Sequence, residues 1–185
     1  MHKSSGFTLV ELVIVVVIVS IVSTVVIPSF RAIIQDNRLA VNTNLIVEGL
    51  NLTLSEATRC SCQVTMCKST NGSTCVNDGT GDDWQTGWIV FADNGDLGEF
   101  DATDGDTLVR SFELTSDELT LTAGNVIKDY VSFNARAQPR SGNGGLMAVA
   151  DTFGLCDTRG ASEARKIELS NIGHIKLETG VASCP

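Results

Sequence analysis

A single carboxylate lies inside the most apolar stretch of the chain. Residues 7–27 read FTLVELVIVVVIVSIVSTVVI, and Glu11 is the one formally charged side chain among them. A charge within a lipid-embedded helix costs about 2.5–3.5 kcal/mol on insertion scales, so this position needs a physical reason. The ordinary reason is an acid close enough to the helix end for its carboxylate to reach the membrane surface.

Six cysteines form the second group of reactive side chains. Four lie between Cys60 and Cys75 and two near the C-terminus, which fits an oxidising compartment better than the cytosol. Among the many pairings that six cysteines allow, we expect Cys67 with Cys75, which bracket a Gly-containing turn, and Cys156 with Cys184. The two remaining cysteines form a Cys-x-Cys pair, whose bridge would be strained if it formed.

A zinc site is the competing interpretation of the first cysteines. Cys60, Cys62 and Cys67 could supply thiolates, but their spacing is not a pair of C-x₂-C units. Both histidines are badly placed, because His2 belongs to the N-terminal segment and His174 lies near the C-terminus. We therefore expect no metal site at the cysteines.

The sequence offers no clear catalytic or calcium-binding set. Nucleophilic catalysis by Ser, Cys or Thr needs a base, and His174, the one histidine beyond the N-terminal segment, falls on a predicted strand. The acidic residues 93–106 could hold Ca²⁺, but Gly95 and Leu97 occupy positions where an EF-hand needs oxygen ligands. Acids in solvated loops seldom act as general acids, so we expect neither enzyme activity nor a cofactor.

The apolar run predicts one membrane-spanning helix. At about 1.5 Å per residue it reaches about 31 Å, close to a hydrocarbon core of about 30 Å. A secretory signal would have a shorter apolar core and a small-residue cleavage site, whereas here Pro28 follows the run. We expect a leader at residues 1–6 and a helix at 7–59, of which 7–27 lie in the membrane.

Beyond Pro28 the helix pattern becomes amphipathic, with two apolar faces. One face should pack on the globular domain, and the other should be covered by another molecule or by more of the same domain. The first stripe holds Phe30, Ile33, Ile34, Val41, Leu45 and Leu52, and the opposite stripe holds Leu39, Ile46, Leu50 and Leu54.

The remainder of the chain has a β pattern. Short strands separated by loops rich in Gly and Asp indicate an α+β protein with a small antiparallel, sandwich-like domain at residues 60–185. The net charge of −9 disfavours DNA binding by bulk electrostatics. We expect strands at 63–66, 88–91, 107–114, 118–121, 130–133, 146–149, 165–169 and 174–177, with a hairpin turn at 170–173.

The sequence GFTLVEL at residues 6–12 resembles the class III signal of type IV pilins and type II secretion pseudopilins. The resemblance implies that a prepilin peptidase cuts after Gly6 on the cytoplasmic side and methylates Phe7 as the new N-terminus. It also implies that Glu11 pairs with the N-terminal amine of a neighbouring subunit and that Pro28 bends the helix. An ionised carboxylate is costly alone in an apolar filament core, so its pairing can select the register of a docking subunit.

Two further stretches resemble the GspH/FimT family of minor pilins and pseudopilins. The sequence GWIVFAD at residues 87–93, preceded by Asp83-Trp84, is similar to the central signature of that family. Residues 155–160 and 164–173 resemble its FimT and FimU branch. Together with the N-terminal signal, the resemblance covers almost the whole chain and implies a type IV pilin-like fold.

Some FimT-like minor pilins are associated with DNA uptake through a C-terminal Gly-Arg-x-Arg motif. Here GHIK stands at the matching positions, so His174 and Lys176 replace two bidentate arginines with a mostly neutral ring and a point charge. Arg159, Arg165 and Lys166 could still complete a local basic patch. We expect DNA binding to be weak.

The resemblance implies a minor pilin that initiates or supports type IV pilus assembly, in twitching, adhesion or DNA uptake. Its implied partners are other pilins, the inner-membrane assembly machinery and the prepilin peptidase. Its implied location is the bacterial inner membrane, single-pass with a periplasmic globular domain, and then the pilus. The alternatives are an H-type pseudopilin of type II secretion, which the cysteines at 156 and 184 disfavour, and a DNA-binding minor pilin for transformation.

Overall fold

The computed structural model describes residues 6–82, 84–114, 118–140, 144–181 and 184. The expected leader before Gly6 and Asp83 of the tryptophan motif therefore lie outside the described residues. The described part contains one long helix, α1 (Leu9–Cys60), and two short 3-10 turns, η1 (Trp84–Thr86) and η2 (Ala102–Asp104). The strands are β1 (Val64–Lys68), β2 (Trp88–Ala92), β3 (Thr107–Phe112), β4 (Thr120–Ala123), β5 (Tyr130–Phe133), β6 (Pro139–Arg140), β7 (Asp151–Cys156), β8 (Arg165–Leu169) and β9 (Ile175–Thr179).

The chain divides into two compact units, Met1–Asn37 and Arg38–Pro185, so α1 contributes to both. The expected boundary at residue 60 marks the end of the helix, but the globular unit begins earlier. It does so because the second half of α1 supplies one wall of the core. In length and composition, α1 is apolar enough to cross a membrane.

Three hydroxyl groups of the first unit form their hydrogen bonds within the helix. Ser20, Ser23 and Thr24 donate their hydroxyls to backbone carbonyls about one turn earlier, at 2.7–2.8 Å. Such bonds suit a helix in lipid, where no water is available to pair a hydroxyl. The helix continues through Pro28 without a break.

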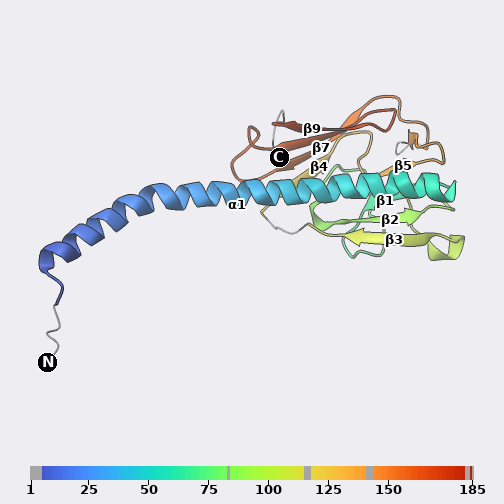
Figure 1. Cartoon of the computed structure of the whole chain (residues 1–185). Coiled ribbons are helices and arrows are strands. Elements are labelled where there is room, and N and C mark those ends of the chain that lie inside the picture. The colour runs from blue at the N-terminus through green and yellow to red at the C-terminus, as the bar shows by residue number, and fades with distance from the viewer. Residues whose placement is uncertain (1–5, 83, 115–117, 141–143, 182–183, 185) are drawn as a thin grey trace. The chain divides into compact units, whose positions relative to one another are not determined.

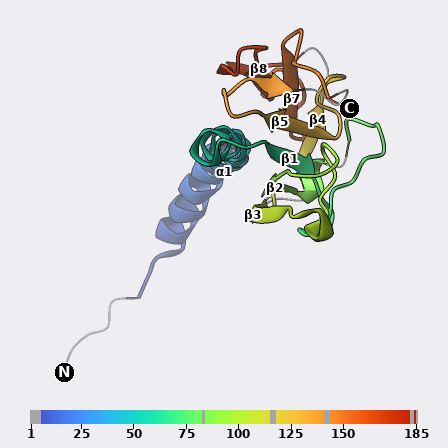
Figure 2. The ribbon, with the colours of Figure 1, turned by 90° about the vertical axis from the view of Figure 1, so that its right-hand side faces the viewer.

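The second unit is built from two antiparallel sheets and the second half of α1 (Figures 1 and 2). The first sheet has the strand order β3-β2-β1-β5-β6, and the second has the order β4-β7-β8-β9. This arrangement confirms the expected α+β class with small antiparallel sheets. The turn expected at residues 170–173 is present, with the Ser170 N–H donating to the His174 carbonyl at 2.9 Å.

One face of the second half of α1 lies in the core. Its residues Leu39, Ile46, Leu50 and Ala57 follow helical spacing and are fully buried. The opposite stripe is only partly exposed in the single chain: Val41 is 49% exposed, whereas Leu45 and Leu52 are partly buried and pack against the core. The buried face packs against inward side chains of both sheets, among them Val64, Met66, Trp88, Val90, Val131, Phe133, Phe153, Leu155, Ile167 and Leu169.

Close approach of the helix to β2 requires a glycine. A Cβ placed at Gly49 would lie 2.6 Å from Nε1 of Trp88 and 3.2 Å from Sδ of Met66. Such distances are far below van der Waals contact, so any side chain here would push the helix off the sheet. The cost of glycine within a helix is about 1 kcal/mol, and the tight packing offsets it.

The strand expected at residues 146–149 is wrong. Leu146 makes only an isolated bridge to Arg140, and both Leu146 and Val149 are more than half exposed. The strand at this place in the fold is β7, whose sequence DTFGLC lacks a clear alternating pattern because Asp and Gly interrupt it. Phe153 of β7 is nevertheless fully buried, with its ring 5.0 Å from that of Trp84.

Smaller differences concern strand edges. The strand expected at 118–121 forms two residues later as β4, and the two-residue strand β6 was not expected. The other expected strands form within two residues of their predicted edges, and those at 130–133 and 165–169 form without change.

Candidate functional site

The carboxylate of Glu11 is held at the start of α1 by Thr8. Glu11 Oε2 accepts hydrogen bonds from the Thr8 backbone N–H and from the Thr8 hydroxyl, both at 3.0 Å. In return, the Glu11 backbone N–H donates to Thr8 Oγ1 at 3.2 Å. This reciprocal pattern is a capping box, with threonine before the first helical residue and glutamate three positions later.

The capping box holds the carboxylate at Thr8, at the N-terminal end of the helix. Glu11 Oε1 accepts no hydrogen bond from the residues that the structure describes, so one oxygen is available to a further donor. Phe7 is 80% exposed and adjoins Thr8 in the chain. The sequence predicted that Glu11 reaches the membrane surface or pairs with a neighbouring subunit, but its capping role was missed, although Thr-x-x-Glu before an apolar run is a recognisable capping signal.

The apolar side chains of the first unit have no partner in the single chain. Those described between Leu9 and Ile34 are almost all 40–80% exposed. An uninterrupted apolar surface of this kind requires a lipid or protein environment. Glu11 is therefore a charged group within a surface that another apolar phase must cover.

The basic residues near the C-terminus are paired with acids of the same unit. Lys166 Nζ lies 2.8 Å from Glu178 and 3.3 Å from Glu168, and Lys176 Nζ lies 2.6 Å from Glu178. Hydrogen bonds from Lys166 and Lys176 lower the pKa of Glu178 to about 2. The two lysines are thus largely neutralised where they stand.

The remaining residues of the expected basic patch also have local partners. Arg159 lies 2.8 Å from Asp157, and its hydrogen bonds keep the pKa of Asp157 below its ordinary value although burial acts in the opposite direction. Arg165 donates to the Glu163 carbonyl and the Thr179 hydroxyl, each at 3.4 Å, and its charge also helps to lower the pKa of Asp157. The backbone N–H of His174 donates to the Ser170 hydroxyl at 2.9 Å, within the β8–β9 turn.

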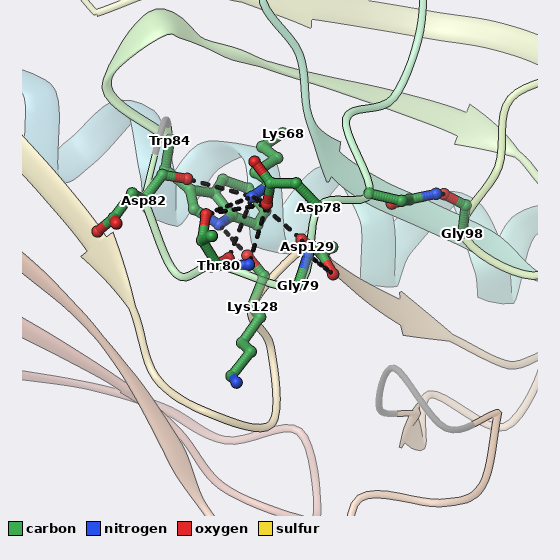
Figure 3. A network of polar contacts seen from close by, with 10 residues as sticks. Lys68, Asp78, Gly79, Thr80, Asp82, Trp84, Gly98, Lys128 and Asp129 are labelled. Carbon is green, nitrogen blue, oxygen red and sulfur yellow. Dashed lines mark hydrogen bonds and ion pairs between the residues drawn. The ribbon is translucent and has the colours of Figure 1, made fainter.

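A fully buried lysine was missed by the sequence analysis. The Lys68 ammonium pairs with Asp78 and lies 3.0 Å from Asp129, and it donates to the Thr80 carbonyl at 3.1 Å (Figure 3). Burial would lower the pKa of Lys68, but hydrogen bonds to the two aspartates outweigh it and raise the pKa. The amine therefore stays protonated and acts as a clamp rather than as a nucleophile.

The Lys68 cluster fixes the segment between β1 and η1. Asp129 also accepts from the Gly79 N–H at 3.0 Å, and Trp84 Nε1 donates to the Lys128 carbonyl at 2.8 Å. No short sequence motif signals this cluster, because Asp129 lies far from Lys68 in the chain.

The structure contains three disulfides. They join Cys67 to Cys75 and Cys156 to Cys184, as expected from the sequence, and Cys60 to the remaining Cys62. No group of metal-ligating side chains occurs in the described ranges.

The carboxylates of the acidic loop shape the loop itself. Asp93 accepts from the Thr65 hydroxyl at 2.5 Å and from the Gly98 N–H at 3.0 Å, and burial raises the pKa of Asp93. Asp106 accepts from the backbone N–H groups of Asn94 and Asp101.

Comparison with known proteins gives two family matches. A prokaryotic N-terminal methylation motif matches residues 1–27, and the family described as type II transport protein GspH matches residues 42–173, more than half of the chain. A comparison with curated proteins gives no match.

Two solved structures share the fold. Both are crystal structures of the type IV minor pilin FimU from Pseudomonas aeruginosa strain PAO1, and both are 17% identical to this chain. One has a TM-score of 0.60 and covers 82% of this chain and 98% of its own. The other has a TM-score of 0.55, with 79% and 98% covered. The likeness places the chain in the type IV pilin fold.

Proposed function

Because the chain belongs to the GspH family, we propose that it is a minor pilin that helps to initiate or support type IV pilus assembly. The observation that carries the proposal is the single carboxylate of Glu11, held at the start of an otherwise apolar helix with one oxygen available. In this proposal the protein is a non-enzymatic subunit, and its partners are other pilins and the inner-membrane assembly machinery.

The proposed function begins with processing at the N-terminus. A prepilin peptidase removes residues 1–6 and methylates Phe7, as the match to the methylation motif supports. Cleavage creates a cationic amine one residue before Thr8. In the filament, the amine of one subunit donates to the available oxygen of Glu11 in its neighbour. Pro28 adjusts the path of the helix within the filament.

The pairing would mainly set the axial position at which a new subunit docks in the filament. A carboxylate without a cation is costly in an apolar filament core, so a subunit docked one step too high or too low loses stability. The apolar side chains around Glu11 supply attraction of low specificity, because they pack similarly at many positions. One ion pair can therefore select among these positions, and the globular domain stays on the periplasmic side of the membrane.

Variants at Glu11 and Thr8 separate the charge from the helix cap. Glu11→Val removes both, Glu11→Gln keeps a side chain able to complete a capping box but removes the charge, and Thr8→Ala weakens the cap but keeps the charge. We expect all three proteins to insert in the membrane at wild-type levels. Glu11→Val and Glu11→Gln should fail to prime surface pili, whereas Thr8→Ala should retain pili; normal piliation in Glu11→Gln would reject the proposal.

A pseudopilin of type II secretion is the second candidate, because the matching family is described as a type II transport protein. The fold shared with a type IV minor pilin and the C-terminal disulfide favour the pilus. Deleting the gene decides between them: loss of surface pili with normal protein secretion supports the pilus, and the reverse supports the secretion system.

A further inference from the structure

The bridge between Cys60 and Cys62 differs from the other two disulfides in its accessibility. Cys60 is exposed, and Cys62 is partly buried. Each of the other bridges has one cysteine in the core, Cys67 at 0% and Cys156 at 2% exposure. A thiolate from solution can therefore reach Cys60 more easily than either of those two buried sulfurs.

The same bridge spans the shortest stretch of chain. The sequence separation of its cysteines is 2, against 8 and 28 for the other bridges. In the chain-entropy account, the stability that a disulfide adds grows with the length of the loop that it closes. By this measure the Cys60–Cys62 bridge adds the least to the stability of the fold.

The residue between the two cysteines has a strained backbone. Ser61 has a φ of 54°, in the left-handed region that residues with a side chain rarely adopt. Helices commonly end with a residue in this conformation, but glycine usually occupies the position. Opening the bridge lets Ser61 return to an ordinary backbone conformation, so reduction is favoured relative to that of a relaxed bridge.

The chain on both sides of the bridge is held independently of it. On the helix side, Ala57 is fully buried in the core. On the strand side, the Gln63 carbonyl accepts from the Asp93 N–H at 2.9 Å, and Val64 is fully buried. Opening the bridge therefore frees residues 60–62 and leaves the core contacts of α1 and β1 in place.

We propose that Cys60 and Cys62 form a thiol–disulfide exchange site, which a dithiol reduces while the other two disulfides stay closed. One sulfur of the dithiol, as a thiolate, attacks Sγ of Cys60 and forms a mixed disulfide; the bond to Cys62 breaks, and Cys62 leaves as a thiolate and takes up a proton. The second sulfur of the dithiol then attacks the first, which closes the dithiol's own disulfide and releases Cys60 to be protonated in turn. Two electrons and two protons pass from the dithiol to the two cysteines.

The test titrates the full mature chain in detergent micelles with mixtures of reduced and oxidised dithiothreitol. Free thiols are alkylated with one isotopic form of iodoacetamide, the remaining bridges are reduced and alkylated with another, and each cysteine is measured by peptide mass spectrometry. At the mixture that opens half of the Cys60–Cys62 bridge, less than about one tenth of each other bridge should be open. Glutathione at equal thiol concentration should leave the bridge mostly closed, because the adjacent Cys62 thiolate displaces a monothiol from Cys60.

Variants of Ser61 test the contribution of the strained backbone. Ser61→Gly accepts the left-handed conformation at little cost, so its bridge should require about threefold more reduced dithiothreitol than that of the wild type. Ser61→Ala is the matched control, because it removes the hydroxyl but keeps Cβ and the strain, and it should titrate as the wild type does. The fluorescence of buried Trp84 and Trp88 shows whether each protein keeps its fold.

Two results would overturn the proposal. One is opening of the Cys67–Cys75 or Cys156–Cys184 bridge at the same or a lower proportion of reduced dithiothreitol than the Cys60–Cys62 bridge. The other is identical titration of Ser61→Gly, Ser61→Ala and wild type, because the strain that distinguishes this bridge would then be absent. Both results are measured on the purified chain, so they do not depend on the proposed role in pilus assembly.

Discussion

Replacing Lys68 by methionine should destabilise the globular unit strongly. The methionine side chain is close in size to lysine, so the change removes a cation and leaves little cavity. The Lys68 side chain is fully buried, and its partners Asp78 and Asp129 are 39% and 19% exposed. Without the ammonium, two carboxylates remain close together with no cation between them.

The size of the effect follows from this partial burial. Breaking a fully buried ion pair by removing one partner costs about 3–5 kcal/mol. Water reaches Asp78 and screens part of the resulting repulsion, so we expect a loss of about 2–3 kcal/mol. For a unit of this size the loss lowers the melting temperature by roughly 5–10 °C.

The destabilisation should depend on pH in a defined direction. Lys68 has a raised pKa in the folded state, so its contribution is present below its unfolded pKa and is lost as pH rises through the folded value. Hydrogen bonds from Lys68 and Thr80 hold the pKa of Asp78 well below its ordinary range, so its contribution is lost as pH falls through that lowered value. The difference in unfolding free energy between wild type and Lys68→Met should be largest at about pH 5–10 and should shrink in acid.

Thermal unfolding of the full chain in detergent, followed by tryptophan fluorescence, measures this gap. Both tryptophans, Trp84 and Trp88, are buried in the globular unit and report on it directly. Lys128→Met is the matched control, because the Lys128 ammonium points away from the cluster in Figure 3 and should cost less than about 0.5 kcal/mol. Equal melting temperatures for Lys68→Met and Lys128→Met would refute the claim that the Lys68 ion pairs stabilise the globular unit.

Three further predictions concern processing, the C-terminal disulfide and DNA. The mature chain should begin at N-methyl-Phe7, and Gly6→Val should block cleavage; a mature chain that keeps Met1, or one cut after Ile27, would contradict this in N-terminal mass analysis. Cys184→Ser should destabilise the globular unit by about 3–4 kcal/mol, since Cys156 and Cys184 close a loop with a separation of 28 residues; non-reducing peptide maps that join Cys156 to another cysteine would exclude the pairing. Because Lys166 and Lys176 are already paired with acids, duplex DNA should bind no more tightly than about 10⁻⁴ M at physiological salt; micromolar binding that Lys176→Ala abolishes would show otherwise.

The parts of the fold that could be predicted from the sequence are those with strong local signals. The helix is long and continuously apolar and then amphipathic, so its limits were predicted within two residues. β5 and β8 are short runs between clear turn signals, and they form where expected. The strand β7 was missed because Asp151 and Gly154 interrupt its pattern, and its burial comes from the sheet around it.

Most of the polar contacts were less predictable, because strand pairing brings their partners together. The Lys68 clamp depends on Asp129, which lies 61 residues further along the chain and reaches the lysine only through the pairing of β1 with β5. The same holds for the acids that neutralise Lys166, since Glu178 meets it across the β8–β9 hairpin. The capping of Glu11 by Thr8 is local and could have been recognised from the spacing alone.

The most direct test of the central claim is to locate the protein in purified filaments. Surface pili are sheared from cells that produce the wild-type chain, and their peptides are measured by mass spectrometry beside those of the membrane fraction. We predict peptides of this chain in the sheared pili, with an N-terminus at N-methyl-Phe7, and their loss from pili but not from membranes in Glu11→Gln. Retention of the wild-type chain in the membrane fraction alone, or equal recovery of Glu11→Gln from pili, would contradict it.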